Sequence, residues 1–290
     1  ENREESAASV TFVVRFLTLE KTAIVASPAG GGGDAATAAH LPKPRAITTF
    51  AEARFVFLLA QKHLDAALTF FKLDGHVTDH VYLMRAISRL YRDLSLFETD
   101  EKRRQAMFLR RASALQPLVD QLNPRVYTGL LKMLSFELGE VYLTLLEMKS
   151  ARIEQKLGES RGREGGRGGA YVPSKAEGEK CDEYCRLAIR AFEGFVPLYQ
   201  KDSEGGREGG KAIVWDLPSK EDFGPVFRAS FHLARLYGRM FVYGGPGESA
   251  HKGRVDGNKK SLEAYEWIRN FAAEQLERLW SGEEGGKETY

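Results

Sequence analysis

Most of this chain, from residue 48 to residue 280, consists of amphipathic stretches separated by glycine, proline and asparagine. Thr49 and Ser174 each stand three residues before a glutamate, and Asn123 precedes a proline. The first two patterns are capping boxes, and the third places a cap residue before a proline at the first helical position. These signals and the helical periodicity predict α-helices at residues 49–62, 64–73, 79–97, 101–121, 125–157, 175–201, 222–242 and 259–280.

The expected helices form consecutive pairs with a shared pattern. The first helix of each pair has an apolar residue, a small residue and, three positions later, an aromatic residue: Leu138, Gly139 and Tyr142; Leu233, Ala234 and Tyr237; Ile87, Ser88 and Tyr91; and, with arginine replacing the small residue, Ala53, Arg54 and Phe57. The second helices carry Ala66 with Phe70, Ala188 with Phe192, and Ala264 with Ile268. Small residues let paired helices approach, as in tetratricopeptide hairpins, although no regular period of about 34 residues is kept. The pattern predicts an all-α, tetratricopeptide-like solenoid of helical hairpins.

Glycine-rich and charged stretches interrupt this pattern near residues 158–174, 203–218 and 244–258. Such stretches lack the apolar side chains that a packed core requires. We therefore predict that all three are inserted loops.

These boundaries suggest three regions. Residues 1–46 form a poorly defined N-terminal segment with a Gly/Ala/Pro linker, residues 47–281 a tetratricopeptide-like helical domain, and residues 282–290 a flexible tail. The first region includes an apolar, β-rich stretch at residues 10–19. Because the chain opens without an initiator methionine, we expect a fragment or a processed chain.

Composition excludes several classes of protein. The 42 basic and 40 acidic residues nearly cancel, so no overall basic field recruits nucleic acid. The apolar runs, such as residues 55–60, are much shorter than the roughly 18–20 residues of a membrane span. Only Cys181 and Cys185 occur, too few for a disulfide framework, and we interpret them as buried free thiols rather than half of a metal site.

One short stretch resembles an active site. Residues 73–80 read LDGHVTDH and contain four side chains that can ligate a metal or transfer a proton: Asp74, His76, Asp79 and His80. We favour a turn between helices, in which Leu73 ends one helix, Gly75 adopts a left-handed conformation, and Thr78 caps the next helix. A metal site remains the alternative.

Other polar features also have two interpretations. The Arg/Gly-rich stretch at 161–169 could bind RNA, but its glutamates and its lack of aromatic residues favour a plain loop. A basic group on one predicted helix is typical of a solvated face, with an acidic partner as the alternative: Lys102, Arg103, Arg104, Arg110 and Arg111. His232, between apolar residues, is interpreted as a core or groove histidine.

The order of several motifs resembles the C-terminal half of the kinesin-binding protein family. The runs DQLNP, FELGEVY and HLARLYG occur in series, and the resemblance covers about residues 47–270. The resemblance implies a right-handed α-solenoid that binds kinesin motor domains and keeps them off microtubules. It also implies a cytoplasmic, cytoskeleton-associated regulator of microtubule-based transport, and we expect that the N-terminal half of such a protein is missing from this chain. The family carries an aromatic residue where this chain has His80, which argues against a two-histidine site.

Our leading hypothesis is therefore a non-enzymatic protein that engages kinesin motor domains, with microtubule-associated complexes as further partners. It predicts no catalytic residue, cofactor, metal, nucleic acid or membrane span, and no short motif identifies the partner-contacting residues. The first alternative is a tetratricopeptide-like scaffold for another protein complex. The second is a metal-dependent enzyme at Asp74, His76, Asp79 and His80.

Overall fold

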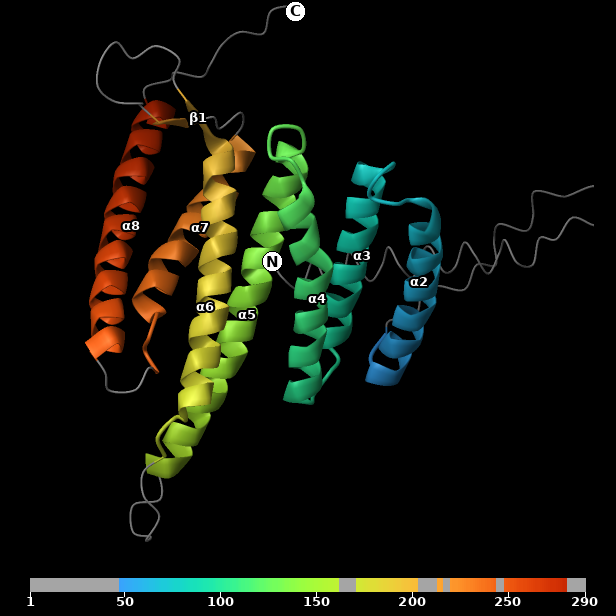
Figure 1. Cartoon of the computed structure of the whole chain (residues 1–290), viewed down its shortest axis with the longest axis horizontal. Coiled ribbons are helices and arrows are strands. Elements are labelled where there is room, and N and C mark those ends of the chain that lie inside the picture. Colours follow the sequence, from blue (N-terminus) through green and yellow to red (C-terminus); the bar gives the residue numbers. More distant parts are fainter. Residues whose placement is uncertain (1–46, 162–170, 203–212, 216–219, 244–247, 281–290) are drawn as a thin grey trace, which may run out of the picture. The chain divides into compact units, whose positions relative to one another are not determined.

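The computed structural model describes residues 47–161, 171–202, 213–215, 220–243 and 248–280 (Figure 1). The described residues form seven α-helices, a 3-10 helix and one pair of short strands, so the predicted all-α class with consecutively packed helices is confirmed. The chain divides into two compact units, one reaching Leu115 and the other beginning at Gln116. The expected terminal regions, residues 1–46 and 282–290, lie outside the described residues, and the expected domain division stays a prediction.

The first unit contains α2 (Phe50–Phe70), α3 (Val77–Ser95) and most of α4 (Glu101–Gln121). The prediction of two helices at 49–62 and 64–73 was wrong, because α2 is continuous. Neither glycine nor proline interrupts it, so nothing breaks its backbone ladder. Ala66 and Phe70 are both exposed and do not provide the packing expected of a second helix.

The core of the first unit comes from the predicted helix faces. Ala53 and Phe57 of α2 are buried against Ile87 and Tyr91 of α3, and the Phe57 and Tyr91 ring centroids lie 4.9 Å apart. Ser88 is also fully buried, and its hydroxyl oxygen accepts a 3.2 Å hydrogen bond from the Arg111 Nε of α4. The predicted pattern of an apolar residue, a small residue and, three positions later, an aromatic residue therefore identified residues that form the contacts between these helices.

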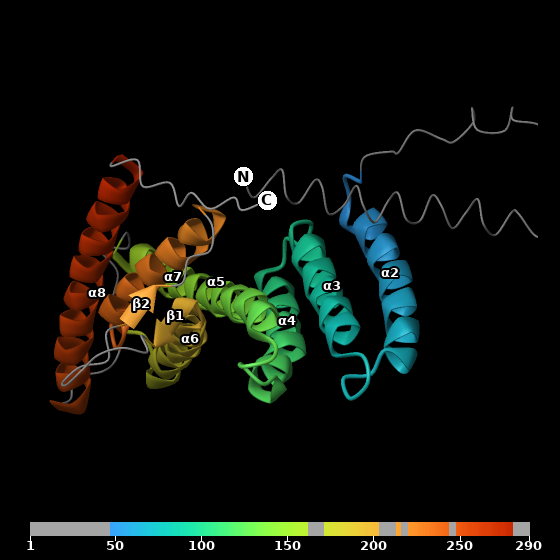
Figure 2. The same cartoon turned by 90° about the horizontal axis from the view of Figure 1, so that it is seen from above.

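The second unit contains α5 (Thr128–Arg161), α6 (Lys175–Phe195), the 3-10 helix η2 (Val196–Tyr199), α7 (Lys220–Arg239) and α8 (Glu248–Trp280). Figures 1 and 2 both show α5 beside α6, and α7 beside α8. The predicted C-terminal boundary of α6 was wrong. The helix expected at 175–201 ends at Phe195 because Pro197 cannot donate to an α-helical ladder. The chain then enters the unpredicted strand β1 (Gln200–Asp202), antiparallel to β2 (Ile213–Trp215).

Polar caps explain where helices start. The side chains of Thr49 and Ser174 both form the predicted capping boxes, with Glu52 and Glu177. Asn123 does not start α5, which was expected at residue 125 and begins at Thr128. Its side-chain oxygen instead accepts a 2.9 Å hydrogen bond from the Arg125 N–H and closes a turn ahead of the helix.

The beginning of α8 corrects the predicted loop at 244–258. Residues 248–258 are helical, and two glycines one turn apart lie against α7 and the turn that follows it. A Cβ added at Gly253 would lie 2.5 Å from the Phe241 ring, and one at Gly257 would lie 2.5 Å from the Tyr237 carbonyl oxygen. These glycines, which looked like loop residues in the sequence, permit close helix packing.

Gly139 shows the same effect between α5 and α6. A Cβ at this position would lie 2.7 Å from the ring of Phe192, which is fully buried. The small residue of the predicted pattern therefore determines how closely these helices approach.

We expect Gly139→Ala to destabilise the protein by about 1–3 kcal/mol, because the added methyl overpacks the α5–α6 contact. Gly158 is the matched control in the same helix, since nothing lies within 4 Å of its Cβ position. Gly158→Ala should stabilise the protein by about 0.5–1 kcal/mol through helix propensity. Denaturant unfolding measures both values, and equal effects of the two substitutions would contradict the close packing.

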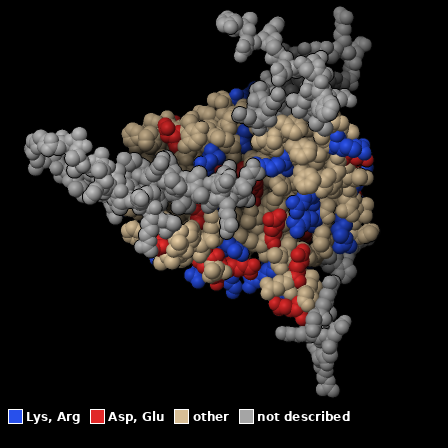
Figure 3. Space-filling model, turned by 180° about the vertical axis from the view of Figure 1, so that it is seen from behind, with Lys and Arg blue, Asp and Glu red and all other residues tan. Residues whose placement is uncertain are grey.

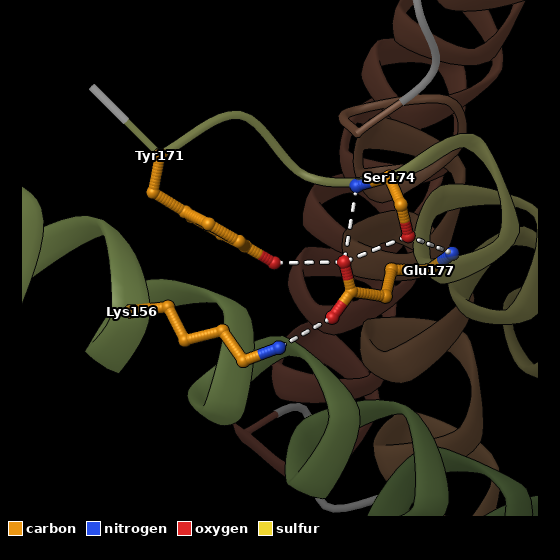
Figure 4. Close-up of polar contacts among 4 residues, drawn as sticks. All are labelled: Lys156, Tyr171, Ser174 and Glu177. Atoms are coloured by element: carbon orange, nitrogen blue, oxygen red, sulfur yellow. Dashed lines mark hydrogen bonds and ion pairs between the residues drawn. The ribbon is translucent and has the colours of Figure 1, made fainter. Parts of the chain in front are cut away.

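Glu177, at the start of α6, joins the chain before α6 to the C-terminal half of α5 (Figure 4). Its Oε1 accepts a 2.7 Å hydrogen bond from Lys156 Nζ, and its Oε2 accepts hydrogen bonds of 2.7 Å from the Tyr171 hydroxyl and 2.8 Å from the Ser174 hydroxyl. The hydrogen bonds from Lys156, then Tyr171 and Ser174, hold the pKa of Glu177 well below its ordinary value of 4.5.

Glu177→Gln should lower the melting temperature near neutral pH, because the amide loses the ion pair with Lys156. A carboxyl whose pKa is depressed by folding stabilises the folded state above its ordinary pKa and loses this effect as pH falls. We therefore expect the difference in melting temperature between wild type and variant to shrink below pH 4.5. Glu183→Gln, which removes an exposed pair with Lys180, is the control and should change little. A difference in melting temperature between wild type and Glu177→Gln that persists at acid pH would argue against a stabilising ion pair between Glu177 and Lys156.

Candidate functional site

The turn LDGHVTDH is a connection between α2 and α3, but its details differ from the prediction. Helix α2 ends at Phe70 rather than Leu73, and Gly75 does not have a left-handed backbone. The Gly75 and His76 N–H groups instead both donate to the Lys72 carbonyl oxygen. His76, not Thr78, is the N-cap residue of α3 and makes no side-chain capping hydrogen bond.

The two histidines of this turn have other contacts. His80 Nδ1 lies 2.9 Å from the Phe71 carbonyl oxygen, and since a carbonyl only accepts, this nitrogen carries the proton. The His76 ring packs against Phe70 and Phe71, with centroid distances of 5.2 and 5.3 Å. In the described part of the chain, which includes the whole turn, no three His, Cys, Asp or Glu side chains are grouped to hold a metal ion.

His80→Ala should destabilise the protein by about 0.5–1.5 kcal/mol, because the carbonyl at the end of α2 loses its hydrogen bond. Asp74→Asn is the control and should be neutral, since Asp74 is exposed. A chelator should leave the unfolding curve of the wild type unchanged. Zinc-dependent stabilisation that both substitutions abolish would instead support the metal-site alternative.

The other sequence candidates are mostly internal. Cys181 and Cys185 are buried free thiols, as predicted, and burial raises the pKa of Cys185 to about 12. The basic group on α4 is not one solvated face, because Arg111 is buried and its Cζ lies 5.1 Å from the Phe108 ring centroid. Arg103 pairs with Glu98 at 3.6 Å. The Arg/Gly-rich stretch lies almost wholly outside the described residues.

Six residues of the second unit form a surface that we call the cation–aromatic surface: Lys132 and Phe136 of α5, Tyr199 of η2, and Arg228, His232 and Arg235 of α7. Helical spacing places the two α5 residues on one face and the three α7 residues on another. Arg228 and Arg235 are exposed, whereas Lys132, Phe136 and His232 are half-buried. Tyr199 is brought beneath Lys132 by the 3-10 turn that begins before Pro197.

Cations cover the rings of this surface. The Lys132 Nζ lies 3.5 Å from the Tyr199 ring centroid, and the Arg228 Cζ lies 5.2 Å from that of Phe136. His232 stacks on Phe192 of α6, with centroids 5.4 Å apart and planes at 23°. Because Phe136 also contacts Phe192 and Phe195, the buried aromatic cluster of α6 supports the outer residues from below.

The electrostatic environment of this surface is positive. Burial, and then the charges of Arg235 and Arg228, lower the pKa of His232, which favours the neutral ring near physiological pH. Its Nδ1 is buried and has no hydrogen-bond partner among the described residues. Among the described side chains, Lys132, Arg228 and Arg235 form no ion pair with a carboxylate. On the face drawn in Figure 3, basic and acidic side chains are interspersed with uncharged ones.

This arrangement suits binding of an anionic group. Fixed cations over aromatic rings attract carboxylates, and the half-buried rings add apolar contact. The prediction of His232 as a core or groove residue is confirmed, but the sequence did not reveal its neighbours. The only local signals were the Lys132–Phe136 spacing and the positions of Arg228, His232 and Arg235, which are ordinary helix-surface patterns.

Comparisons with known proteins agree with the resemblance found in the sequence. The family model described as "KIF-1 binding protein C terminal" matches residues 34–285. The chain is 30% identical over 223 residues to the KIF-binding protein of Gallus gallus, 31% over 225 to that of Xenopus tropicalis, and 28% over 228 to that of Homo sapiens. These alignments cover 77%, 77% and 79% of this chain but 33%, 32% and 32% of the relatives. The chain thus spans about a third of the length of the curated relatives it matches. No solved structure matches it.

Among the described residues, no helix is long and apolar enough to cross a membrane.

Proposed function

This chain belongs to the KIF-1 binding protein C-terminal family, and we propose that it binds a kinesin motor domain without catalysing a reaction. The observation that carries the proposal is the family match over residues 34–285, together with relatives named KIF-binding protein. Because the chain corresponds to about a third of those relatives, it would supply part of the full binding surface.

The helical architecture supports this proposal. Packed helix pairs bury one face of each helix and leave side chains of successive helices on a common surface, which suits the recognition of a folded partner. The cation–aromatic surface is such a place, since its residues come from α5, η2 and α7 and are supported by the core below. Binding of this kind needs no catalytic group.

Binding would regulate the motor by steric competition. A partner held on the microtubule-binding face of a motor domain prevents that face from reaching the filament, and so reduces transport along microtubules. The proposal therefore locates the protein in the cytoplasm, near the cytoskeleton. A helical scaffold with another client would not compete in this way.

We expect the 290-residue chain to retain at least one motor head from a panel of kinesins in a pull-down. The same motor should then pellet less with microtubules when the chain is present in excess. A helical-repeat protein of unrelated sequence, at equal concentration, should leave co-sedimentation unchanged. Retention of no motor would overturn the proposal, and retention without displacement would leave binding but overturn the competition mechanism.

A further inference from the structure

Two of the three cations of the cation–aromatic surface are held over aromatic rings, and no described carboxylate forms an ion pair with any of the three. Lys132 and Arg228 lie over the rings of Tyr199 and Phe136, at 3.5 and 5.2 Å from the centroids. Arg235 lies one turn beyond His232 on the exposed face of α7. A cation fixed by a ring loses less side-chain freedom on binding than a free one, so the surface is prepared for a negative ligand.

The spacing of the exposed cations limits the shape of that ligand. Arg228 and Arg235 are seven positions apart on one helix, which corresponds to about 10 Å along its axis. Two carboxylates can match this distance when they lie about three residues apart in an extended segment or seven apart in a helix. A single small anion reaches only one of the two.

We propose that the cation–aromatic surface binds an acidic segment of the partner, with carboxylates about 10 Å apart that contact Arg228 and Arg235. This inference rests on the proposed function and makes that segment part of a kinesin motor domain. Half-buried Phe136 lies beneath Arg228 and supports that end of the surface.

A protein segment fits this surface better than a nucleic acid does. Proteins that bind single strands need free ring faces on which bases stack. Here the faces of Tyr199 and Phe136 are covered by Lys132 and Arg228, and the His232 ring is stacked on Phe192. The net charge of the whole chain is only +2, so the chain lacks the overall positive charge that would attract it to a phosphate backbone.

The test compares two double variants of the full chain with the same charge change. Arg228→Glu/Arg235→Glu alters the surface, and Arg190→Glu/Lys252→Glu alters exposed cations on α6 and α8 for which no ion pair is described. Circular dichroism establishes that each variant keeps the wild-type helix content and melting transition. If the first variant is misfolded, Arg228→Gln/Arg235→Gln replaces it.

Fluorescence anisotropy then measures the Kd of a labelled motor head that the wild type retains, at low and at physiological ionic strength. We expect the surface variant to bind at least tenfold more weakly and with less dependence on salt, and the control to stay within about threefold of wild type. Equal affinity of both variants would overturn the inference while the proposed function stands. Absence of binding by the wild type to every motor head would overturn the proposed function itself.

A labelled single-stranded RNA of mixed sequence serves as a second probe. We expect no binding by the wild type at physiological ionic strength. Tight RNA binding that only the surface variant loses would identify a nucleic-acid surface and overturn the acidic-segment inference.

Discussion

The close approach of neighbouring helices at glycine determines the structure of the second unit. Gly139 lets the Phe192 ring enter the groove of α5, Gly178 brings α6 against the Tyr243 carbonyl oxygen, and Gly257 brings α8 against that of Tyr237. At each site a Cβ would lie less than 3.0 Å from its neighbour, a distance that real Cβ atoms essentially never show. Short interhelical distances place more atoms within dispersion range and leave little freedom to slide, so these glycines fix both the spacing and the register of the helices.

This constraint explains which parts of the fold could be predicted from sequence. The capping boxes and the apolar, small and aromatic spacing depend on residues within one helix, so the local pattern was sufficient for them. Gly253 and Gly257 lie in a glycine-rich stretch whose composition is that of a loop, although both belong to helix α8. The reason for glycine at these positions is contact with α7 and the turn after it, which the local sequence does not reveal. The continuity of α2 was missed because we expected a pair of helices here, although no glycine or proline interrupts residues 50–70.

The candidate site was beyond sequence reasoning for a geometric reason. Lys132 and Arg235 lie about a hundred positions apart, and the packing of α5, α6 and α7 is what brings their surroundings together. The opposite case is LDGHVTDH, where four polar residues are adjacent in the sequence and yet serve a turn. His80 contacts a backbone carbonyl, and His76 contacts two phenylalanines and lies 3.9 Å from Asp79. No three of the four side chains are grouped to hold a metal ion.

Core packing and surface chemistry are linked through Phe192. Its ring fills the space that Gly139 leaves open, makes an edge contact with Phe136 and stacks with His232. A residue that fixes the distance between α5 and α6 therefore also supports the rings beneath the exposed cations. Unpaired arginines on a surface destabilise a fold little as long as water reaches them. An aromatic ring below an arginine attracts the cation and so offsets part of this small destabilisation. The second unit can thus keep an uncompensated positive surface for a partner while its stability depends on the close glycine contacts underneath.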